Sequence, residues 1–336
     1  MKLADGNPPE NSLPAGVTDS ALETSIKRSG YPLQSRVAAL LQPHLTTLEE
    51  EWGYVDADSG ELRTLDLYGW KQVGTDRELS SKRVRANISW LIECKQAELP
   101  YVFFQSLSAS LRQFPKLIGL GRDELELETN NSRSTWTVPL QIALSLNRTT
   151  FGARTAAPTA TSVSRVARKG KDLELSGSDA YLSTILPLVK ACDYLSQMHV
   201  PKDTYRYFDL HAVLMVCVLD APMVVVKLEG AGPELVLAPW VRLVRQQAKR
   251  SPEDAFDTAS VYGIDFVHVA FLERFVIDHV AMFAGDFSAR VYRHPSELVS
   301  GTGFIENLEG RALPVDAEAE LRPRGVRMRR GRDARR

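Results

Sequence analysis

The alternation of hydrophobic and polar residues predicts a helix and then a three-stranded meander in the first hundred residues. In YPLQSRVAALL, apolar side chains recur at Leu33, Val37, Leu40 and Leu41, after a proline suited to a first helical turn. HLTTLEEEWGYVD, LRTLDLYGW and ANISWLIECK have the composition of strands, and the turn residues of DADSGE separate the first two. A charged loop, KQVGTDRELSSKRVR, joins the second strand to the third.

The rest of the chain predicts further elements with less regular patterns. SDAYLSTILPLVKACDYLSQM is the clearest later helix, with Ser178 as its N-cap and Pro187 as a kink or break. Two strands, around Val213–Leu219 and Met223–Leu228, precede a strand in DFVHVAF and an amphipathic helix in FLERFVIDHVAMFAGDF. Residues 114–146 carry mixed signals, so ELELET and TWTVPLQIAL stay open between strand and helix start.

These elements predict one α/β domain over residues 29–310. Residues 1–28 are polar and rich in Pro and Gly, and they are expected to form a disordered leader. Residues 148–178 are rich in Ala, Thr and Ser without periodicity, and they predict a mobile insertion. Residues 311–336 are expected to form a disordered, Arg-rich tail.

Composition places the chain among ordinary globular proteins. Of its 336 residues 44% are hydrophobic and 25% charged, and the net charge is −1, so any affinity for nucleic acid must come from local patches. Cys94, Cys192 and Cys217 are widely spaced in apolar contexts, which predicts reduced thiols. The most hydrophobic run, VLMVCVLDAPMVVVKL, is broken by Asp220 and Pro222, whereas a membrane helix needs about 20 uninterrupted apolar residues. We therefore expect a cytoplasmic protein without a membrane span.

An acidic and a basic residue, Glu93 and Lys95, interrupt the apolar strand WLIECK. Residues two apart in a strand project to the same side, so these two lie together and Cys94 faces the opposite side. Antiparallel pairing with LRTLDL would bring Asp66 close to Glu93. Two adjacent carboxylates repel each other unless a cation lies between them, and Mg²⁺ suits such a site, with the backbone carbonyl of Cys94 as a further ligand. An exposed ion pair on an edge strand is the simpler alternative.

LRTLDLYGW followed by WLIECK resembles the core of the PD-(D/E)XK, or restriction-endonuclease-like, nuclease superfamily. The resemblance covers about residues 29–105. It implies a central mixed sheet flanked by helices, with Asp66 and Glu93 as ligands of Mg²⁺ or Mn²⁺ and Lys95 as the residue that assists the attacking water. Many relatives carry a supporting glutamate in the first helix, where this chain has Gln34. Glu49, Glu50 and Glu51 are all open as substitutes.

The function implied by this resemblance is metal-dependent hydrolysis of DNA in restriction or defence, and a homodimer is a further expectation. Two basic segments could contact phosphates: one holds Arg165, Arg168 and Lys169, and the C-terminal one includes Arg329 and Arg330. Solvated, flexible segments are the plain alternative for both. The alternative function is a catalytically degenerate fold that binds nucleic acid or a partner protein.

Overall fold

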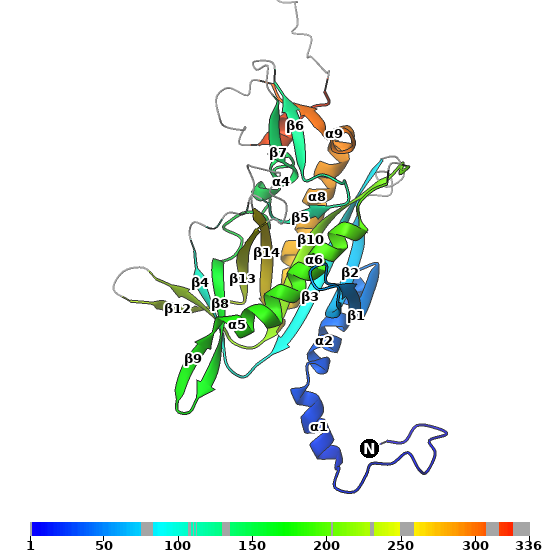
Figure 1. The fold of residues 1–336 in the computed structure, drawn as a ribbon, viewed down its shortest axis with the longest axis vertical. Helices are drawn as coiled ribbons and strands as arrows, with labels where there is room; N and C mark the ends of the chain where they lie inside the picture. Colours follow the sequence, from blue (N-terminus) through cyan, green and yellow to red (C-terminus); the bar gives the residue numbers. More distant parts are fainter. Residues whose placement is uncertain are drawn as a thin grey trace, which may run out of the picture.

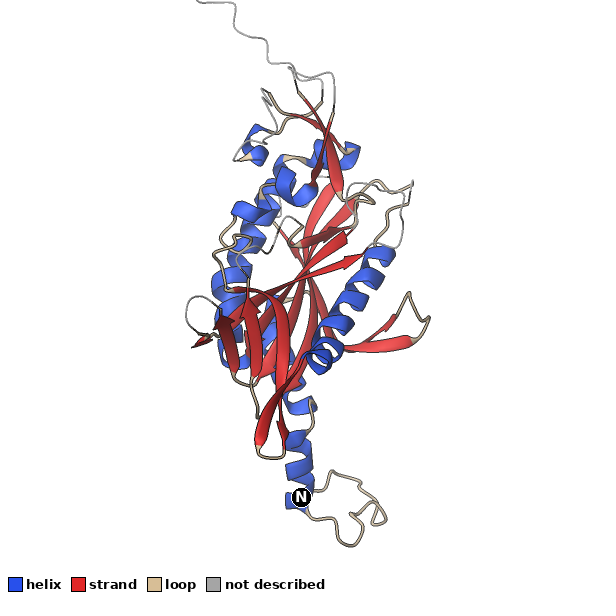
Figure 2. Ribbon diagram, turned by 60° about the vertical axis from the view of Figure 1, so that its left-hand side comes forward, coloured by secondary structure: helices blue, strands red, loops and turns tan. Residues whose placement is uncertain are grey.

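A large mixed β-sheet with helices on both faces forms the centre of the protein, as a computed structural model shows (Figures 1 and 2). The structure describes residues 2–74, 83–106, 109, 111, 113–129, 135–202, 204–228, 232–248, 259–306 and 316–324. The predicted α/β class is therefore confirmed at this level, a mixed sheet between layers of helices.

Twelve strands form the main sheet in the order β1-β2-β3-β10-β14-β13-β8-β4-β11-β12, with β5 beside β10 and β9 beside β8. A separate sheet has the order β15-β6-β7. The strands are β1 Thr47–Val55, β2 Leu62–Val73, β3 Val84–Gln96, β4 Tyr101–Gln105, β5 Lys116–Ile118, β6 Glu124–Glu128, β7 Trp136–Pro139, β8 Thr159–Lys169, β9 Asp172–Ser176, β10 Phe208–Asp220, β11 Met223–Lys227, β12 Glu234–Leu237, β13 Trp240–Ala248, β14 Ala259–His268 and β15 Thr302–Phe304.

The α-helices are α1 Asp19–Arg28, α2 Tyr31–Leu41, α4 Leu140–Ala143, α5 Gly177–Ala180, α6 Leu186–Met198, α7 Leu272–Arg274, α8 Ala281–Arg293, α9 Pro295–Ser300 and α10 Ala317–Glu320. Short 3₁₀ turns lie at Gln42–His44, Leu146–Arg148 and Val269–Phe271. Two π-helical turns, Tyr181–Ile185 and Phe275–Val280, lead into α6 and α8. The predicted interruption at Pro187 therefore takes the form of a π-helical turn just before that proline.

The helix and meander predicted for the first hundred residues are present as α2, β1, β2 and β3. β1–β2 and β2–β3 pair antiparallel, and β10 pairs parallel with β3 along its whole length, from Phe208 opposite Val84 to Asp220 opposite Gln96. Parallel neighbours need a crossover connection, and α6 lies in the chain between these two strands.

Two apolar layers cover the faces of the central strands. β10 is buried over most of its length, because α8 and α2 pack on one face and α6 on the other. Ile92 and Cys94 of β3 belong to the α8 layer, and Leu91 belongs to the α6 layer. Strands buried on both faces need continuous hydrophobic runs, as the sequence of β10 provides.

The segment predicted to be a mobile insertion, residues 148–178, is instead largely ordered. Its second half forms the β8–β9 hairpin, and β8 joins the sheet by pairing with β4 and β13. Val163 and Val166 are the buried apolar residues of the outer part of β8, too few to give a visible period. The strand depends on backbone pairing with neighbours distant in sequence, which composition does not reveal.

The predicted leader and tail are each partly structured. Within residues 1–28, Thr18 caps α1, which has Asp19 in its first turn and Lys27 and Arg28 in its last, as helix ends prefer. Within residues 311–336, α10 packs on the core through Ala317 and Leu321. The N-cap of α5, which continues into α6, is Ser176 and not the predicted Ser178. The side-chain hydroxyl of Ser176 accepts a hydrogen bond from the backbone N–H of Asp179.

Two further expectations concern the cysteines and membranes. Cys94, Cys192 and Cys217 are buried free thiols, as predicted. Over the ranges that the structure describes, we find no helix with the length and apolar character that crossing a bilayer requires.

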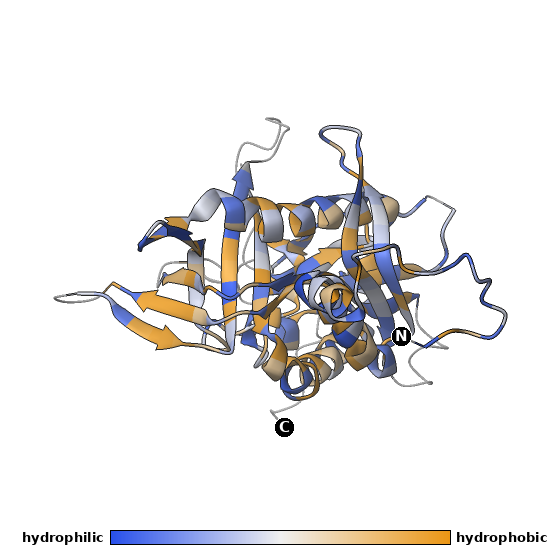
Figure 3. Ribbon diagram, turned by 90° about the horizontal axis from the view of Figure 1, so that it is seen from below, coloured by the Kyte–Doolittle hydropathy of each residue, from blue (hydrophilic) through white to orange (hydrophobic). Residues whose placement is uncertain are grey.

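The β11–β12 hairpin forms an apolar edge of the sheet (Figure 3). Leu235 and Leu237 of β12 are exposed, as is Leu228 just after β11. Exposed apolar edges favour pairing with another chain. The expected homodimer stays a prediction, and this edge is a surface on which to look for it.

Candidate functional site

Strands β2 and β3 separate at the position of Asp66 and Glu93. Their antiparallel pairing runs from Val73 opposite Ala86 to Leu67 opposite Ile92 and ends there. Beyond this point β2 continues beside β1, and β3 continues beside β10. The next two residues, Asp66 and Glu93, therefore lie just beyond the last paired residues of the two strands.

The structure brings Asp66, Glu93 and Lys95 together at this opening. Asp66 Oδ2 accepts a hydrogen bond from the backbone N–H of Cys94 at 2.6 Å. This bond takes the place of the backbone hydrogen bonds that end where β2 and β3 separate. Lys95 Nζ donates to Glu93 Oε1 and lies 3.9 Å from Asp66 Oδ2. The predicted convergence of the three side chains is thus present, and their chemical roles stay a prediction.

Glu93 is the most deeply buried member of this group, with only 6% of its surface exposed. Its second carboxylate oxygen, Oε2, is buried without a hydrogen-bond partner. Burial raises the pKa of Glu93 to about 7, and Asp66 adds to the rise, while Lys95 opposes it. A buried carboxylate oxygen without a partner is costly, and a proton or a bound cation would reduce that cost.

The pKa values of Asp66 and Lys95 are both raised. For Asp66 the main cause is burial, partly opposed by the Cys94 amide and the charge of Lys95. For Lys95, burial alone would lower the pKa, but the carboxylates of Glu93 and Asp66 outweigh it. Lys95 therefore remains an ammonium group, a cation beside two carboxyl groups.

Cys94 and Gln34 hold the surroundings of the site in place. The Cys94 side chain points into the opposite layer, as the strand period predicted, and burial raises the pKa of its thiol. The ligand role expected for its carbonyl stays a prediction. Gln34 of α2 is buried, and its Nε2 donates to the backbone oxygen of Asp66 at 3.2 Å. Its amide thus positions the main chain of Asp66.

Only two of the group's side chains, Asp66 and Glu93, are carboxylates able to hold a cation. Within the described ranges, no three or more His, Cys, Asp or Glu side chains lie close enough together to hold a metal ion. The pair nevertheless fits a hard divalent cation, since both groups offer oxygen and Glu93 Oε2 has no protein donor.

The basic residues proposed for nucleic-acid contact fall in two different places. Arg165, Arg168 and Lys169 are exposed on the β8–β9 hairpin, which projects from the body of the molecule (Figure 1). Arg165 pairs across from Tyr101, and the charges of Arg165 and Lys95 both act on the pKa of Tyr101. The base of the hairpin therefore lies beside β4, the strand that follows β3 in the chain. Arg329 and Arg330 lie outside the described residues.

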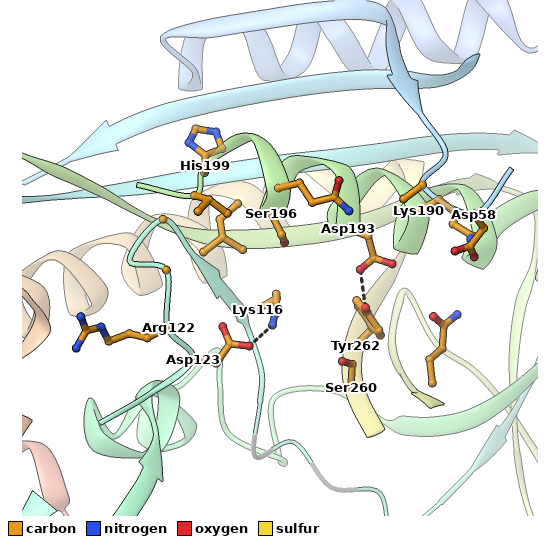
Figure 4. Close-up of a pocket in the computed structure, with 17 residues that line it drawn as sticks. Asp58, Lys116, Arg122, Asp123, Lys190, Asp193, Ser196, His199, Ser260 and Tyr262 are labelled. Atoms are coloured by element: carbon orange, nitrogen blue, oxygen red, sulfur yellow. Dashed lines mark hydrogen bonds and ion pairs between the residues drawn. The ribbon is translucent and has the colours of Figure 1, made fainter. Parts of the chain in front are cut away.

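A cavity of about 610 Å³ lies beside α6 and does not include Asp66, Glu93 or Lys95 (Figure 4). Its charged lining residues are paired with one another or with close neighbours. Lys116 contacts Asp123 at 2.8 Å, Tyr262 donates to Asp193 at 2.6 Å, and Lys190 contacts buried Asp56 at 3.0 Å. Lys190 thus fastens α6 to the end of β1 and is not part of the candidate site.

No protein-family model, curated protein or solved structure matches the chain.

Proposed function

We propose that the protein is a divalent-cation-dependent nuclease with a restriction-endonuclease-like core, hydrolysing phosphodiester bonds of DNA. The observation that carries the proposal is the buried, unpartnered Oε2 of Glu93, beside Asp66 and the ammonium group of Lys95. Neutral packing does not require such a group, because burying it costs free energy. A cation bound at this site would offset the free-energy cost of burying the Glu93 carboxylate.

Each residue of the group has a distinct task in this proposal. Asp66 and Glu93 would hold the cation, and Gln34 keeps Asp66 in position through its backbone oxygen. When bound, the cation supplies Lewis-acid activation of water and of the scissile phosphate. Lys95, held as an ammonium by the two carboxylates, orients the attacking water and offsets the negative charge that grows on the phosphate.

The surroundings of the site also support a nucleic-acid substrate. The exposed cations of the β8–β9 hairpin lie on a projecting arm whose base pairs with β4, where they can contact phosphates along the backbone. Such contacts add affinity that does not depend on sequence. A role in restriction or defence is the biological setting that we infer from the resemblance.

The test is Mg²⁺-dependent cleavage of plasmid DNA by the wild type and by Asp66→Asn, Glu93→Gln and Lys95→Ala. Each change is expected to lower the cleavage rate by at least about 100-fold, the usual size of a lost catalytic group. Glu273→Gln, which changes an exposed carboxylate on α7, is the matched control and is expected to cleave normally. Cleavage that survives all three changes would exclude this site from the reaction.

The alternative is a degenerate nuclease fold that binds nucleic acid without cutting it. Two observations favour it: a group of three metal-binding side chains is missing from the described residues, and the cations of the β8–β9 hairpin are exposed. DNA binding in EDTA, with no uptake of Mn²⁺ by the wild-type protein, would select this alternative.

A further inference from the structure

Another cavity, of about 460 Å³, lies at the end of the sheet where β3 and β10 begin. Its wall is formed by the segment that joins α6 to β10 and by Arg85, near the start of β3. From Arg85 to Glu93 the strand extends roughly 26 Å, at about 3.3 Å per residue. The cavity is therefore separate from the candidate site at Asp66, and its volume is in the range typical of ligand pockets.

Four of the side chains that line this cavity are large, apolar or aromatic, and exposed. They are Met198, Val200, Tyr205 and Tyr207, with exposed fractions between 47% and 59%. All four come from the last residue of α6 and the segment that follows it. Exposed apolar side chains that gather around one cavity are typical of a ligand site, because a ligand with an apolar face would remove them from water.

Hydrogen bonds to Arg83, just before β3, hold the backbone on which the two tyrosines lie. The backbone N–H of Phe208 donates to the backbone oxygen of Arg83 at 2.8 Å, next to the first residues of the parallel pairing between β10 and β3. Arg83 Nε donates to the backbone oxygen of Arg206 at 3.3 Å. Tyr205 and Tyr207 therefore project from a segment that is fixed to the end of the sheet.

Positive charge predominates around the two tyrosine rings. Arg206 lies between them in the chain and is exposed, and exposed Lys202 accepts the backbone N–H of Tyr205 on its own backbone oxygen at 2.9 Å. Asp209 is the one acidic side chain among the described residues that line the cavity, and it contacts Arg85 at 2.7 Å. Arg206 is therefore a cation that a bound anion can contact beside the rings.

Two neutral histidines add hydrogen-bonding groups to the wall of the cavity. His199 lines it, and its ring contacts that of His211, with centroids 4.2 Å apart. His211 is 4% exposed, its Nδ1 lies 2.7 Å from Ser89 Oγ, and its Nε2 has no hydrogen-bond partner among the described residues. Burial lowers the pKa of both histidines, so the pair can donate or accept hydrogen bonds without adding charge.

We propose that this cavity binds an unpaired nucleobase together with its phosphate. Tyr205 and Tyr207 offer ring faces on which a base stacks, and Arg206 binds the phosphate. Every base has such a face, whereas a base inside a duplex is stacked between its neighbours, so the cavity favours single-stranded DNA over duplex. This inference rests on the proposed function for the identity of the ligand, and it names the form of DNA that the protein recognises away from the candidate site.

The experiment measures, by fluorescence anisotropy in EDTA, the affinity of the full-length protein for labelled oligothymidine and for its duplex with oligoadenine. Tyr205→Leu and Tyr207→Leu remove a ring but keep an apolar side chain, and each is expected to weaken single-strand binding by about 5-fold or more, the loss of one base–aromatic stack. Duplex affinity should stay unchanged in both variants. Tyr31→Leu, at an exposed tyrosine of α2, is the matched control and should bind the single strand as wild type does.

Thymidine monophosphate separates the two sources of this ligand chemistry. If it displaces the oligonucleotide from wild-type protein, the cavity binds a single free nucleotide; if it does not, while binding still depends on the tyrosines, the cavity binds a base within a strand.

The inference and the proposed nuclease fail in different ways. Single-strand affinity that survives in both leucine variants would overturn the inference, whether or not the protein cleaves DNA. Affinity that falls in both variants, in a protein that shows no Mg²⁺-dependent cleavage, would uphold the cavity as a base-binding site and refute the nuclease.

Discussion

Replacing Glu93 by Gln should make the metal-free protein more stable at alkaline pH. Gln has nearly the same shape and keeps an oxygen that can accept from Lys95, but it carries no charge to bury. The pKa of Glu93 is about 7 in the folded protein and 4.5 as the reference value for the unfolded chain. The unfolded state therefore releases this proton at lower pH, and stability falls as pH rises from about 4.5 to about 7.

The size of the effect follows from the difference between these two pKa values. Each pKa unit corresponds to about 1.4 kcal/mol, so a shift from 4.5 to about 7 costs roughly 3 kcal/mol once Glu93 is ionised. Below about pH 4.5 Glu93 is protonated in both states and costs nothing. The variant lacks the ionised form, so its advantage over wild type should grow with pH and level off above about pH 7.

Urea unfolding in EDTA at pH 5 and pH 8, followed by circular dichroism, measures this difference. Glu93→Gln should unfold with a free energy up to about 3 kcal/mol above wild type at pH 8, and only about 1 kcal/mol above it at pH 5. Glu50→Gln controls for the loss of an exposed charge and should change stability by less than about 0.5 kcal/mol at both values. A variant no more stable than wild type at pH 8 would refute the idea that Glu93 is held at a cost.

Two further predictions concern groups around the site. A triple variant with Ala at positions 165, 168 and 169 should show a slope of log affinity for duplex DNA against log salt concentration that is smaller by up to about 3, because each lost phosphate contact removes about 0.9. An unchanged slope in fluorescence anisotropy titrations would exclude the hairpin from DNA binding. Gln34→Leu should lower the free energy of unfolding by about 1–3 kcal/mol, because it leaves the Asp66 carbonyl without its donor; a smaller change in urea unfolding would contradict that role.

The placement of Glu93 and Lys95 could be predicted from sequence because it depends on a local rule. Alternation along one strand fixes which side chains share a face, and β3 follows it, with Cys94 in the opposite layer. The continuous apolar run of β10 likewise predicts a strand buried on both faces. Both features can be predicted from a few adjacent residues.

Features that depend on partners distant in sequence could not be predicted. The same alternation would place Leu65 and Leu67 on one face, but the break at Asp66 sends them to opposite layers. The three adjacent glutamates, Glu49 to Glu51, are the same residue type in the sequence, but only Glu51 falls at the break in the β1–β2 pairing and has a left-handed backbone conformation there. β8 is a strand because β4 lies beside it, which no periodicity in its Thr, Ser and Ala residues indicates.

Because β2 changes face at Asp66, the position of this residue depends on packing in both layers of the fold. Leu65 anchors the strand in one layer and Leu67 anchors it in the other, so Asp66 is fixed between two independent sets of packing partners. Sequence changes in the surrounding loops would leave the packing of these two leucines unchanged. The packing of the two leucines thus fixes where residue 66 lies in the fold, whichever side chain that position carries.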